Sequence, residues 1–241
     1  MSTIAEIEIN SLEKFVEFVK TDYKFQTIYR GQPEDKPLLP KIGRIKLTEP
    51  LLEAEQYMIQ LFKEQSIPFL PKSPVQNKDW LALAQHHGLP TRLLDWTSNP
   101  LIALWFAVER PPRKDATGIV WLFKTEKSDF AEGNFNPFSI PVTKIFRPPH
   151  IVPRIRAQSG YFTAHAVTKA GNFVKFENNK RYKDRLKKIK IPANRFSYIR
   201  YDLDIIGINR AFVYSDLDGL AQHIGWLYQL LEDEESKPVP L

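Results

Sequence analysis

The chain has 241 residues, a formal net charge of +6, and 43% hydrophobic and 12% aromatic residues, so it can bury a substantial core in one large domain or two small ones. It contains no cysteine, which excludes disulfides, thiolate nucleophiles and cysteine-ligated zinc sites. No stretch approaches the roughly 20 apolar residues that span a bilayer. Residues 1–10 lack a signal-peptide pattern, so we expect a cytoplasmic protein with no membrane partner.

Helical and extended patterns alternate along the first half of the chain. Apolar residues recur on one face over Ser11–Lys20 and again over Pro50–Gln65, which predicts two helices. Between them, Phe25–Arg30 alternates as a strand does and ends at a turn over Gly31–Pro33. Residues 79–109 then predict a helix, a polar loop and a second helix.

Capping residues mark both ends of that loop. Gly88 and Pro90 stop the first helix, and Thr97-Ser98-Asn99 caps the second, which has Pro100 in its first turn. Unpaired backbone N–H groups and the positive end of the helix dipole at this second start favour an anion.

Strand patterns gather in the middle of the chain, and helical patterns return at its end. We expect a strand over 118–124, extended segments at 142–146 and 151–157, and a strand over 161–167 with 172–176 as a candidate partner. After these we expect a helix over 192–207, a short strand over 210–214, and a final helix that begins at a capping box over 215–218. The final helix is expected to bury Leu217, Leu220, Ala221, Ile224, Leu227, Tyr228 and Leu231. This distribution predicts an α+β fold.

Three parts are expected: an N-terminal helix within 1–22, a main domain over 23–231, and an acidic, proline-containing tail over 232–241. Residues 169–200 carry eleven Lys or Arg against two Asp or Glu, which leaves +9 there and −3 in the rest of the chain. Aromatic residues interleave with these charges, a pattern suited to nucleic-acid phosphates. The alternative is a solvated helix face and a strand edge protected by lysines.

Seven polar residues are concentrated between the two apolar helices of 79–109, as in a site held by a rigid scaffold. They are Gln85, His86, His87, Arg92, Asp95, Thr97 and Ser98. Asp95 has apolar sequence neighbours, where a lone charge is unfavourable, so we expect an arginine partner, either Arg92 or Arg30. Thr97 and Ser98 have a second interpretation, as helix caps only.

Arg30 ends an apolar strand and precedes Gly31, whose missing side chain would let a ligand approach the backbone. Its planar fork of donors suits a phosphate or a carboxylate. A structural salt bridge, for example to Asp95, is the alternative interpretation.

His86 and His87 are neighbours on a helix end, so their side chains point about 100° apart and do not easily share one ion. We therefore expect no metal site. One histidine should pack in the core while the other lines a cleft as a proton carrier, and the sequence leaves open which is which. Gln85 on the same turn is suited to an amide or a ribose hydroxyl.

Other catalytic patterns are absent. A Ser–His–Asp triad can be written from these residues, but no Gly-x-Ser-x-Gly elbow exists. The glycine patterns of Rossmann dinucleotide sites and P-loops are also missing, which disfavours both.

Four segments resemble the FRG family of bacteria and phages, which is named for a Phe/Tyr-Arg-Gly signature. They are Tyr29-Arg30-Gly31-Gln32, the block from Ala84 to Pro100, the segment from Arg154 to Phe162 with Gln158-Ser159-Gly160, and Leu217-Asp218-Gly219-Leu220. The resemblance runs from about Tyr23 to Ile224 and implies an FRG domain over 23–231. It implies no particular activity.

A second resemblance is to ADP-ribosyltransferases of the Arg–Ser–Glu type. These carry an Arg on a first strand, Ser-Thr-Ser before a helix with Ala-x-x-Phe-Ala, and a Glu-x-Glu turn. The matching residues here are Tyr29-Arg30-Gly31 and Thr97-Ser98 followed by Ala103-Leu-Trp-Phe-Ala107. The resemblance implies that Arg30 holds the phosphate and ribose of NAD, the substrate, and that the serine position supports the nicotinamide ribose.

The third part of that pattern differs. Gln158-Ser159-Gly160 stands where Glu-x-Glu would lie. Gln158 is suited to a ribose hydroxyl, but it cannot act as a base or oppose the positive charge of the transition state. Asp95 or one histidine of the pair would have to substitute. The resulting assignments to nucleotide binding are Tyr29, Arg30, Gly31, Gln85, Arg92, Thr97, Ser98 and Phe162, and those to catalysis are His86, His87, Asp95 and Gln158.

The resemblances imply one α+β domain with a mixed, split sheet like that of ADP-ribosyltransferases, helices packed outside it and a helical C-terminal cap. Three functional hypotheses follow. The first is an NAD-processing or ADP-ribosyltransferase-like effector in bacterial conflict, in phage defence or a toxin system, with a macromolecular acceptor or partner protein. The second is a non-catalytic module that binds a nucleotide or a partner, with nucleic acid contacted through 169–200. The third is a buried ion network of Arg30, Arg92 and Asp95. Whether the chain is an enzyme stays open.

Overall fold

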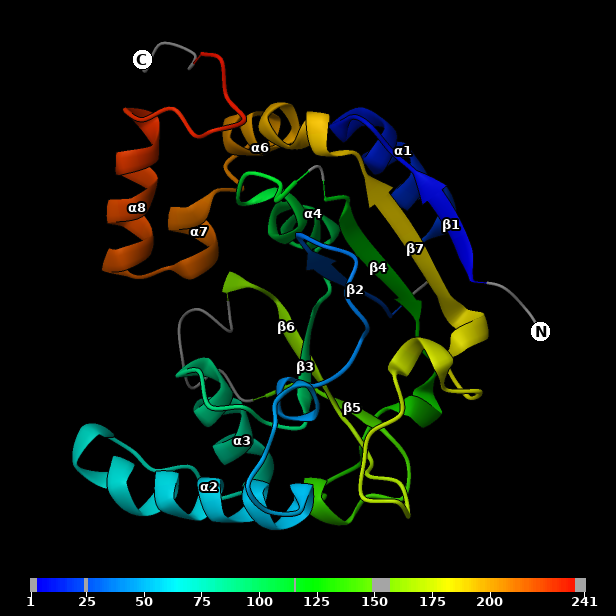
Figure 1. Cartoon of the computed structure of the whole chain (residues 1–241), viewed down its shortest axis with the longest axis vertical. Coiled ribbons are helices and arrows are strands. Elements are labelled where there is room, and N and C mark those ends of the chain that lie inside the picture. The colour runs from blue at the N-terminus through cyan, green and yellow to red at the C-terminus, as the bar shows by residue number, and fades with distance from the viewer. Residues whose placement is uncertain (1–3, 24–25, 115, 149–156, 237–241) are drawn as a thin grey trace.

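The computed structural model describes residues 4–23, 26–114, 116–148 and 157–236. These residues form an α+β domain with one seven-stranded mixed sheet, which confirms the predicted class (Figure 1). The expected segment 151–157 lies almost wholly outside the described residues. Among the described helices, none combines the length and the apolar composition needed to cross a bilayer.

The regular elements follow one another along the chain with short 3₁₀ turns between them. The strands are β1 (Ala5–Glu8), β2 (Thr27–Gln32), β3 (Leu93–Thr97), β4 (Gly118–Lys124), β5 (Lys144–Phe146), β6 (Gly160–Ala164) and β7 (Leu186–Ile191). The helices are α1 (Leu12–Asp22), α2 (Leu51–Ser66), α3 (Asn77–His86), α4 (Pro100–Val108), α6 (Phe196–Ile205), α7 (Arg210–Tyr214) and α8 (Leu217–Leu227).

The sheet is split into two halves. Its strand order is β1-β7-β4-β2-β3-β6-β5, and β1 and β7 form its parallel pair. Strands β2 and β4 are paired along six positions, whereas β2 and β3 are paired only at Tyr29 and Thr97. Beyond that pair β2 and β3 diverge, so a four-stranded half and a three-stranded half meet at one point. We call this junction the seam.

Helix α4 lies directly on the four-stranded half. A Cβ atom at Gly31 of β2 would lie 1.8 Å from the carbonyl oxygen of Ala103, and one at Gly118 of β4 would lie 2.8 Å from that of Ala107. Both glycines therefore let the α4 backbone approach the strands. The apolar helix is buried between these strands and α1 and α6. Helix α4 therefore lies against β2 beside the seam.

Two further cores complete the fold. Aromatic side chains cover the other face of the four-stranded half, and they include Trp121, Phe123, Phe176 and Tyr182. Helices α2 and α3 pack on the three-stranded half through residues such as Ile59, Leu81, Phe146 and Phe162. The aromatic core also contains Leu94 and Trp96 of β3 and Ile145 of β5, so it crosses the seam and packs against both halves of the sheet.

Several predicted elements need correction. The loop between the two central helices contains β3, because Leu93, Leu94 and Trp96 are buried in the sheet. Residues 210–214 form helix α7 and not a strand, since the Asn209 side chain accepts from the Phe212 amide as an N-cap. The N-terminal part includes β1 ahead of its helix, and β2 continues to Gln32.

The basic region and the final helix also differ from expectation. Residues 186–191 form β7, which lies between β1 and β4, so these lysines do not protect a strand edge. Segment 172–176 pairs with its expected partner only through one bridge, Val167 to Phe173. The final helix exposes most of the residues expected to be buried, with Leu217 82% and Tyr228 76% exposed.

Candidate functional site

A cavity of about 290 Å³ opens where β2 and β3 diverge at the seam. Nine of the twelve predicted site residues line it, and they come from β2, α3, β3, the turn before β6, and β6 itself: Tyr29, Arg30, Gly31, Gln85, His86, Asp95, Thr97, Gln158 and Phe162. Trp96 and Phe106 complete the lining. The sheet therefore brings together residues that are far apart in the sequence.

Arg30 spans the seam. Its Nη1 donates to the backbone carbonyl of Asp95 over 2.7 Å and lies 3.4 Å from the Asp95 carboxylate. The divergence of β2 and β3 leaves that carbonyl without a β2 amide, so the guanidinium replaces a ladder hydrogen bond. Its side chain is 17% exposed, and its Nε has no hydrogen-bond partner among the described residues. Arg30 thus places a cation in the cavity wall, while its unpartnered Nε is buried away from solvent.

Asp95 supplies a carboxylate to the cavity. Its side chain is 61% exposed, and Gln85 Nε2 donates to its Oδ1 over 2.7 Å. Thr91 donates its hydroxyl hydrogen to the side-chain carbonyl of Gln85, which fixes the amide orientation. Of the two expected arginine partners, Arg30 is the one that contacts Asp95. The carboxylate is therefore oriented on two sides and still open to a ligand.

Thr97 and Gln158 connect the two halves of the cavity wall. Thr97 donates its hydroxyl hydrogen to the Gln158 backbone carbonyl over 2.6 Å and accepts from the Asn99 amide over 2.9 Å. Gln158 Nε2 donates to the carbonyl of Val213 in α7 over 3.1 Å. Its side-chain carbonyl is left as the group that can accept from a ligand hydroxyl.

The start of α4 is satisfied within the chain. The Asn99 side chain accepts from the Leu101 amide over 2.9 Å and caps the helix. Ser98 is exposed, does not line the cavity, and pairs with the carbonyl of Ser159 through its own amide. Phe106, farther along α4, is the helix residue that reaches the cavity. The helix start therefore lies outside the cavity, and the expected anion site there stays a prediction.

The two histidines differ in their surroundings. His86 is half-buried and lines the cavity, while His87 is exposed and lies outside it. Their rings meet edge to face, with centroids 4.8 Å apart. His86 is thus the histidine of the cavity, whereas the expectation that the other ring packs in the core is wrong, because His87 is exposed.

Arg92 is a structural residue and does not reach the cavity. Its guanidinium lies 2.6 Å from the carboxylate of Glu55, donates to the carbonyl of Pro137 over 2.8 Å, and lies over the ring of Phe138. Both members of the ion pair are fully buried. The expected nucleotide-binding role of Arg92 is therefore wrong, and so is the three-residue network with Arg30 and Asp95.

Gly31 also serves another purpose than expected. The space that its side chain would fill is occupied by the α4 backbone at Ala103, not left open to a ligand.

Trp96 and Phe106 are cavity residues that the sequence analysis missed. Phe106 carried a signal, because it is the Phe of the Ala-x-x-Phe-Ala segment, whereas Trp96 had only its place beside Asp95.

Behind the cavity wall, buried hydrogen bonds join three residues. Trp96 donates to the Thr163 hydroxyl over 3.0 Å, and that hydroxyl lies 3.0 Å from Nε2 of His165. Burial, with the nearby charges of Arg30 and Arg92, lowers the pKa of His165 to about 3. The ring is therefore neutral in the folded protein.

This neutral histidine predicts acid-sensitive stability. The unfolded chain takes up the proton below a pKa of about 6.5, whereas the folded chain does so only near 3, so stability is lost as the pH falls between these values. At pH 5 we expect the wild type to have lost about 2 kcal/mol more than His165→Gln, relative to pH 7. Urea unfolding at both pH values measures this difference, and parallel losses in the two proteins would contradict it.

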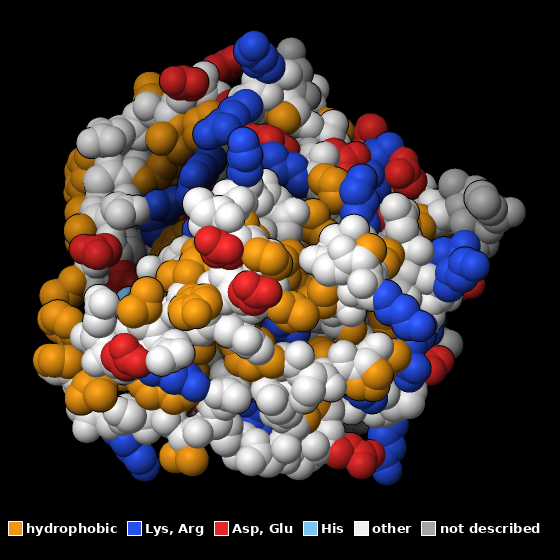
Figure 2. Space-filling model, turned by 60° about the horizontal axis from the view of Figure 1, so that its bottom comes forward, with side chains coloured by type: hydrophobic (Ala, Val, Ile, Leu, Met, Phe, Trp, Pro, Cys, Tyr) orange, Lys and Arg blue, Asp and Glu red, His pale blue; other side chains and the backbone are white. Residues whose placement is uncertain are grey.

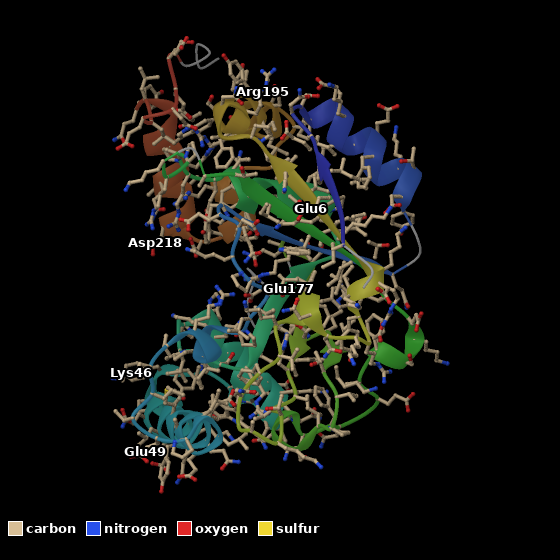
Figure 3. All side chains as sticks on the ribbon, turned by 45° about the vertical axis from the view of Figure 1, so that its right-hand side comes forward. Glu6, Lys46, Glu49, Glu177, Arg195 and Asp218 are labelled. Atoms are coloured by element: carbon tan, nitrogen blue, oxygen red, sulfur yellow. The ribbon has the colours of Figure 1, made fainter. Side chains whose placement is uncertain are left out.

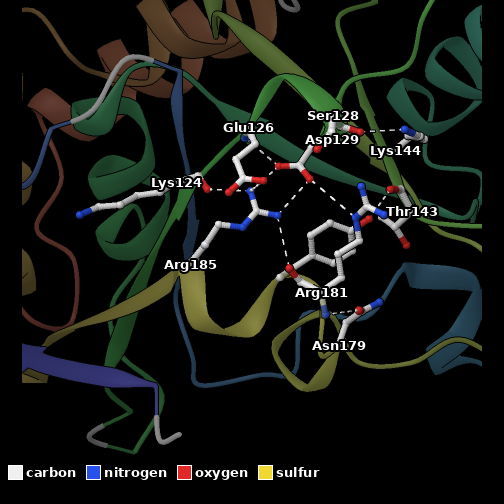
Figure 4. A network of polar contacts seen from close by, with 10 residues as sticks. Lys124, Glu126, Ser128, Asp129, Thr143, Lys144, Asn179, Arg181 and Arg185 are labelled. Carbon is white, nitrogen blue, oxygen red and sulfur yellow. Dashed lines mark hydrogen bonds and ion pairs between the residues drawn. The ribbon is translucent and has the colours of Figure 1, made fainter.

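Much of the basic region is engaged within the fold. Lys187 pairs with Asp22, Lys188 with Asp35 and Lys190 with Glu6. Figure 4 shows Arg185 and Arg181 converging on the buried carboxylate of Asp129, and this contact raises the pKa of Arg185. These cations neutralise carboxylates of the same chain, so fewer charges of 169–200 are available to phosphates than the sequence suggests.

The cavity and the segment that builds it can be compared with known families. Residues 25–116 match the family model of the FRG domain. This FRG segment contains β2, α2, α3, β3 and α4, and it supplies every lining residue of the cavity except Gln158 and Phe162. The motif resemblance extends farther along the chain, to Ile224, than the match does.

No match was found among curated proteins or among solved structures. The match over 25–116 supports the FRG resemblance seen in the motifs. The described part of the Arg154–Phe162 landmark, residues 157–162, lies beside the FRG segment at the seam; residues 154–156 lie outside the described residues.

Proposed function

We propose that the seam cavity binds a nucleotide and that NAD is its substrate, in an ADP-ribosyltransferase-like or NAD-hydrolysing reaction. The observation that carries the proposal is the meeting of Arg30, Thr97 and Gln158 in one cavity. These residues stand at the Arg, Ser and Glu positions of the transferase pattern, on β2, β3 and the turn before β6. A guanidinium suits a pyrophosphate, and the side-chain carbonyl of Gln158 can accept from a ribose hydroxyl.

In this proposal Asp95 provides the negative charge that Gln158 lacks. The bond between ribose C1′ and the nicotinamide nitrogen breaks, and its electron pair leaves with nicotinamide, which becomes neutral. An oxygen of water, or a nucleophile of an acceptor, forms the new bond to C1′, and its proton passes to the Asp95 carboxylate or to solvent. The positive charge that develops at C1′ is opposed by a carboxylate held by Gln85.

The test compares nicotinamide release and ADP-ribose affinity in four proteins: the wild type, Arg30→Ala, Asp95→Asn and Arg113→Ala. Arg30→Ala is expected to weaken ADP-ribose binding about 10- to 100-fold, because a hydrogen bond to a charged group is worth roughly 1.5–3 kcal/mol. Asp95→Asn should retain binding and lose turnover by about 10²-fold or more. Arg113 is highly exposed and lies outside the cavity, so its variant is the control.

Two results would contradict this proposal. If the wild type neither binds ADP-ribose nor releases nicotinamide, NAD is not the substrate. If Arg30→Ala binds ADP-ribose as the wild type does, the arginine does not hold the phosphates. Melting curves of all four proteins establish that each is folded, since Arg30→Ala also removes the donor to the Asp95 carbonyl.

A second candidate function is a binding module without catalysis. The observation that favours it is the turn before β6, which presents Gln158 and no carboxylate to the cavity. This function predicts that NAD and ADP-ribose raise the melting temperature while no nicotinamide is released. The setting in bacterial conflict stays a prediction of the family resemblance, which these measurements of chemistry do not address.

A further inference from the structure

Helix α8 is oriented with its apolar side outward. Its exposed hydrophobic residues are spaced three and four apart along the helix, which places them in one stripe. Leu217 is 82% exposed, Leu220 45%, Ile224 48% and Tyr228 76%. A helix of a soluble domain normally turns such a stripe toward the core. We call these four residues the outer face of α8.

The inner side of α8 is fixed by specific contacts. A Cβ atom at Gly219 would lie 2.6 Å from the Cβ of Tyr214, so α7 and α8 approach closely there. Trp226 donates to the carboxylate of Glu234 over 2.9 Å, and His223 stacks on the Trp226 ring. Rotating the helix to bury its leucines would break the close approach at Gly219 and the hydrogen bond from Trp226 to Glu234. The exposure of the outer face is therefore built into the fold.

Charge flanks the outer face at both ends. Residues 211–236 contain six Asp or Glu and no Lys or Arg. Arg200 pairs with Asp233 and Glu234, which leaves Asp216 and Asp218 exposed at the start of α8 and Glu232 and Glu235 exposed beyond its end. Figure 3 labels Asp218 beside the first turn of α8.

We propose that the outer face of α8 docks an amphipathic helix of a partner protein, with an apolar stripe and Lys or Arg at both ends. Apolar contact along the stripe would supply the affinity, and the two acidic ends would select the charge of the partner. A second copy of this chain fits poorly, because either orientation of two α8 helices brings acidic ends together. Figure 2 shows hydrophobic side chains along the left edge of the molecule, where Figure 1 places both α2 and α8.

The docking surface lies one helix away from the cavity. Gln158 of the cavity wall donates to the carbonyl of Val213 in α7, and α7 packs against α8. A partner on α8 would therefore be held beside the seam. The docking proposal does not depend on the chemistry of the cavity, since it rests on the exposure and charge of α8 alone.

The experiment uses three synthetic helical peptides with the same leucine stripe and with Lys, Gln or Glu at both ends. Fluorescence anisotropy measures their dissociation constants with the full chain. We expect the Lys peptide to bind at least tenfold more tightly than the Gln peptide, and the Glu peptide to bind most weakly. Leu220→Ser with Ile224→Ser should weaken the Lys peptide at least tenfold, whereas Phe69→Ser, which removes an exposed aromatic residue on a different segment, should not.

A charge exchange sharpens the test. Asp218→Lys should weaken the Lys peptide and strengthen the Glu peptide, because Asp218 lies at the exposed start of the helix. The proposal is overturned if no peptide binds or if the three peptides bind equally. It is also overturned if light scattering shows a dimer that Leu220→Ser with Ile224→Ser dissociates, since a second copy would then be the occupant.

Discussion

Glu55→Ala is expected to lower the free energy of unfolding by about 3–5 kcal/mol, because it leaves the buried guanidinium of Arg92 without its counter-charge. The Glu55 carboxylate accepts from Nε of Arg92 over 2.8 Å and from the Arg92 backbone amide over 2.8 Å. One side chain therefore joins α2 to the start of β3. Urea unfolding of the variant measures the loss.

Two further variants identify the cause. Glu53→Ala changes an exposed residue of the same helix and should shift stability by no more than about 0.5 kcal/mol. The double variant Glu55→Met with Arg92→Met removes both charges and should recover much of the loss, since apolar residues often replace a buried ion pair without penalty. A double variant as unstable as Glu55→Ala would contradict the stranded-charge explanation.

Gly31→Ala is expected to destabilise the protein by about 3 kcal/mol or more, at the upper end of overpacking effects. The added Cβ would lie 1.8 Å from the Ala103 carbonyl oxygen and 2.8 Å from the Cβ of Phe106. The first of these atoms belongs to the helix backbone, so α4 as a whole would have to move away from β2. Thermal unfolding and the solubility of the variant measure the effect.

Gly225→Ala is the matched control for this substitution. No atom lies within 4 Å of the Cβ that it would add in α8, and Ala is the better helix former by about 1 kcal/mol. It should therefore stabilise the protein slightly. If Gly31→Ala melts as the wild type does, then α4 does not pack on β2 as closely as the structure shows.

The sequence correctly predicted those elements that are determined by residues within the element or next to it. The strand Gly118–Lys124 and the caps at Gly88 and Asn99 were correct because a continuous apolar run and capping side chains determine them. β3 and β7 were missed because each is a strand only through its neighbours. Lys187, Lys188 and Lys190 suggest a solvated surface in the sequence, whereas in the fold their strand pairs with β1 on one side and with β4 on the other.

The residues of the candidate site could be predicted from the sequence where they lie in short recognisable motifs. Arg30, Asp95 and Thr97 lie in or beside recognisable segments, and the structure brings them into one cavity. Arg92 was misassigned because its partner, Glu55, lies on a different helix with no linking motif. A signal was present, since Glu55 falls four residues before buried Ile59 on the inward face of α2. A lone charge on an apolar helix face indicates a buried counter-ion.

The single pairing of Tyr29 with Thr97 has a mechanical consequence. With so few backbone hydrogen bonds across the seam, the two halves of the sheet are joined mainly by the aromatic core, in which Trp96 of β3 packs against Phe123 of β4. A molecule in the cavity that contacted Arg30 on one half of the sheet and Asp95 or Gln158 on the other would add contacts between the two halves. An occupied cavity would then restrict the motion of the two halves relative to each other, including residues that the bound molecule does not contact.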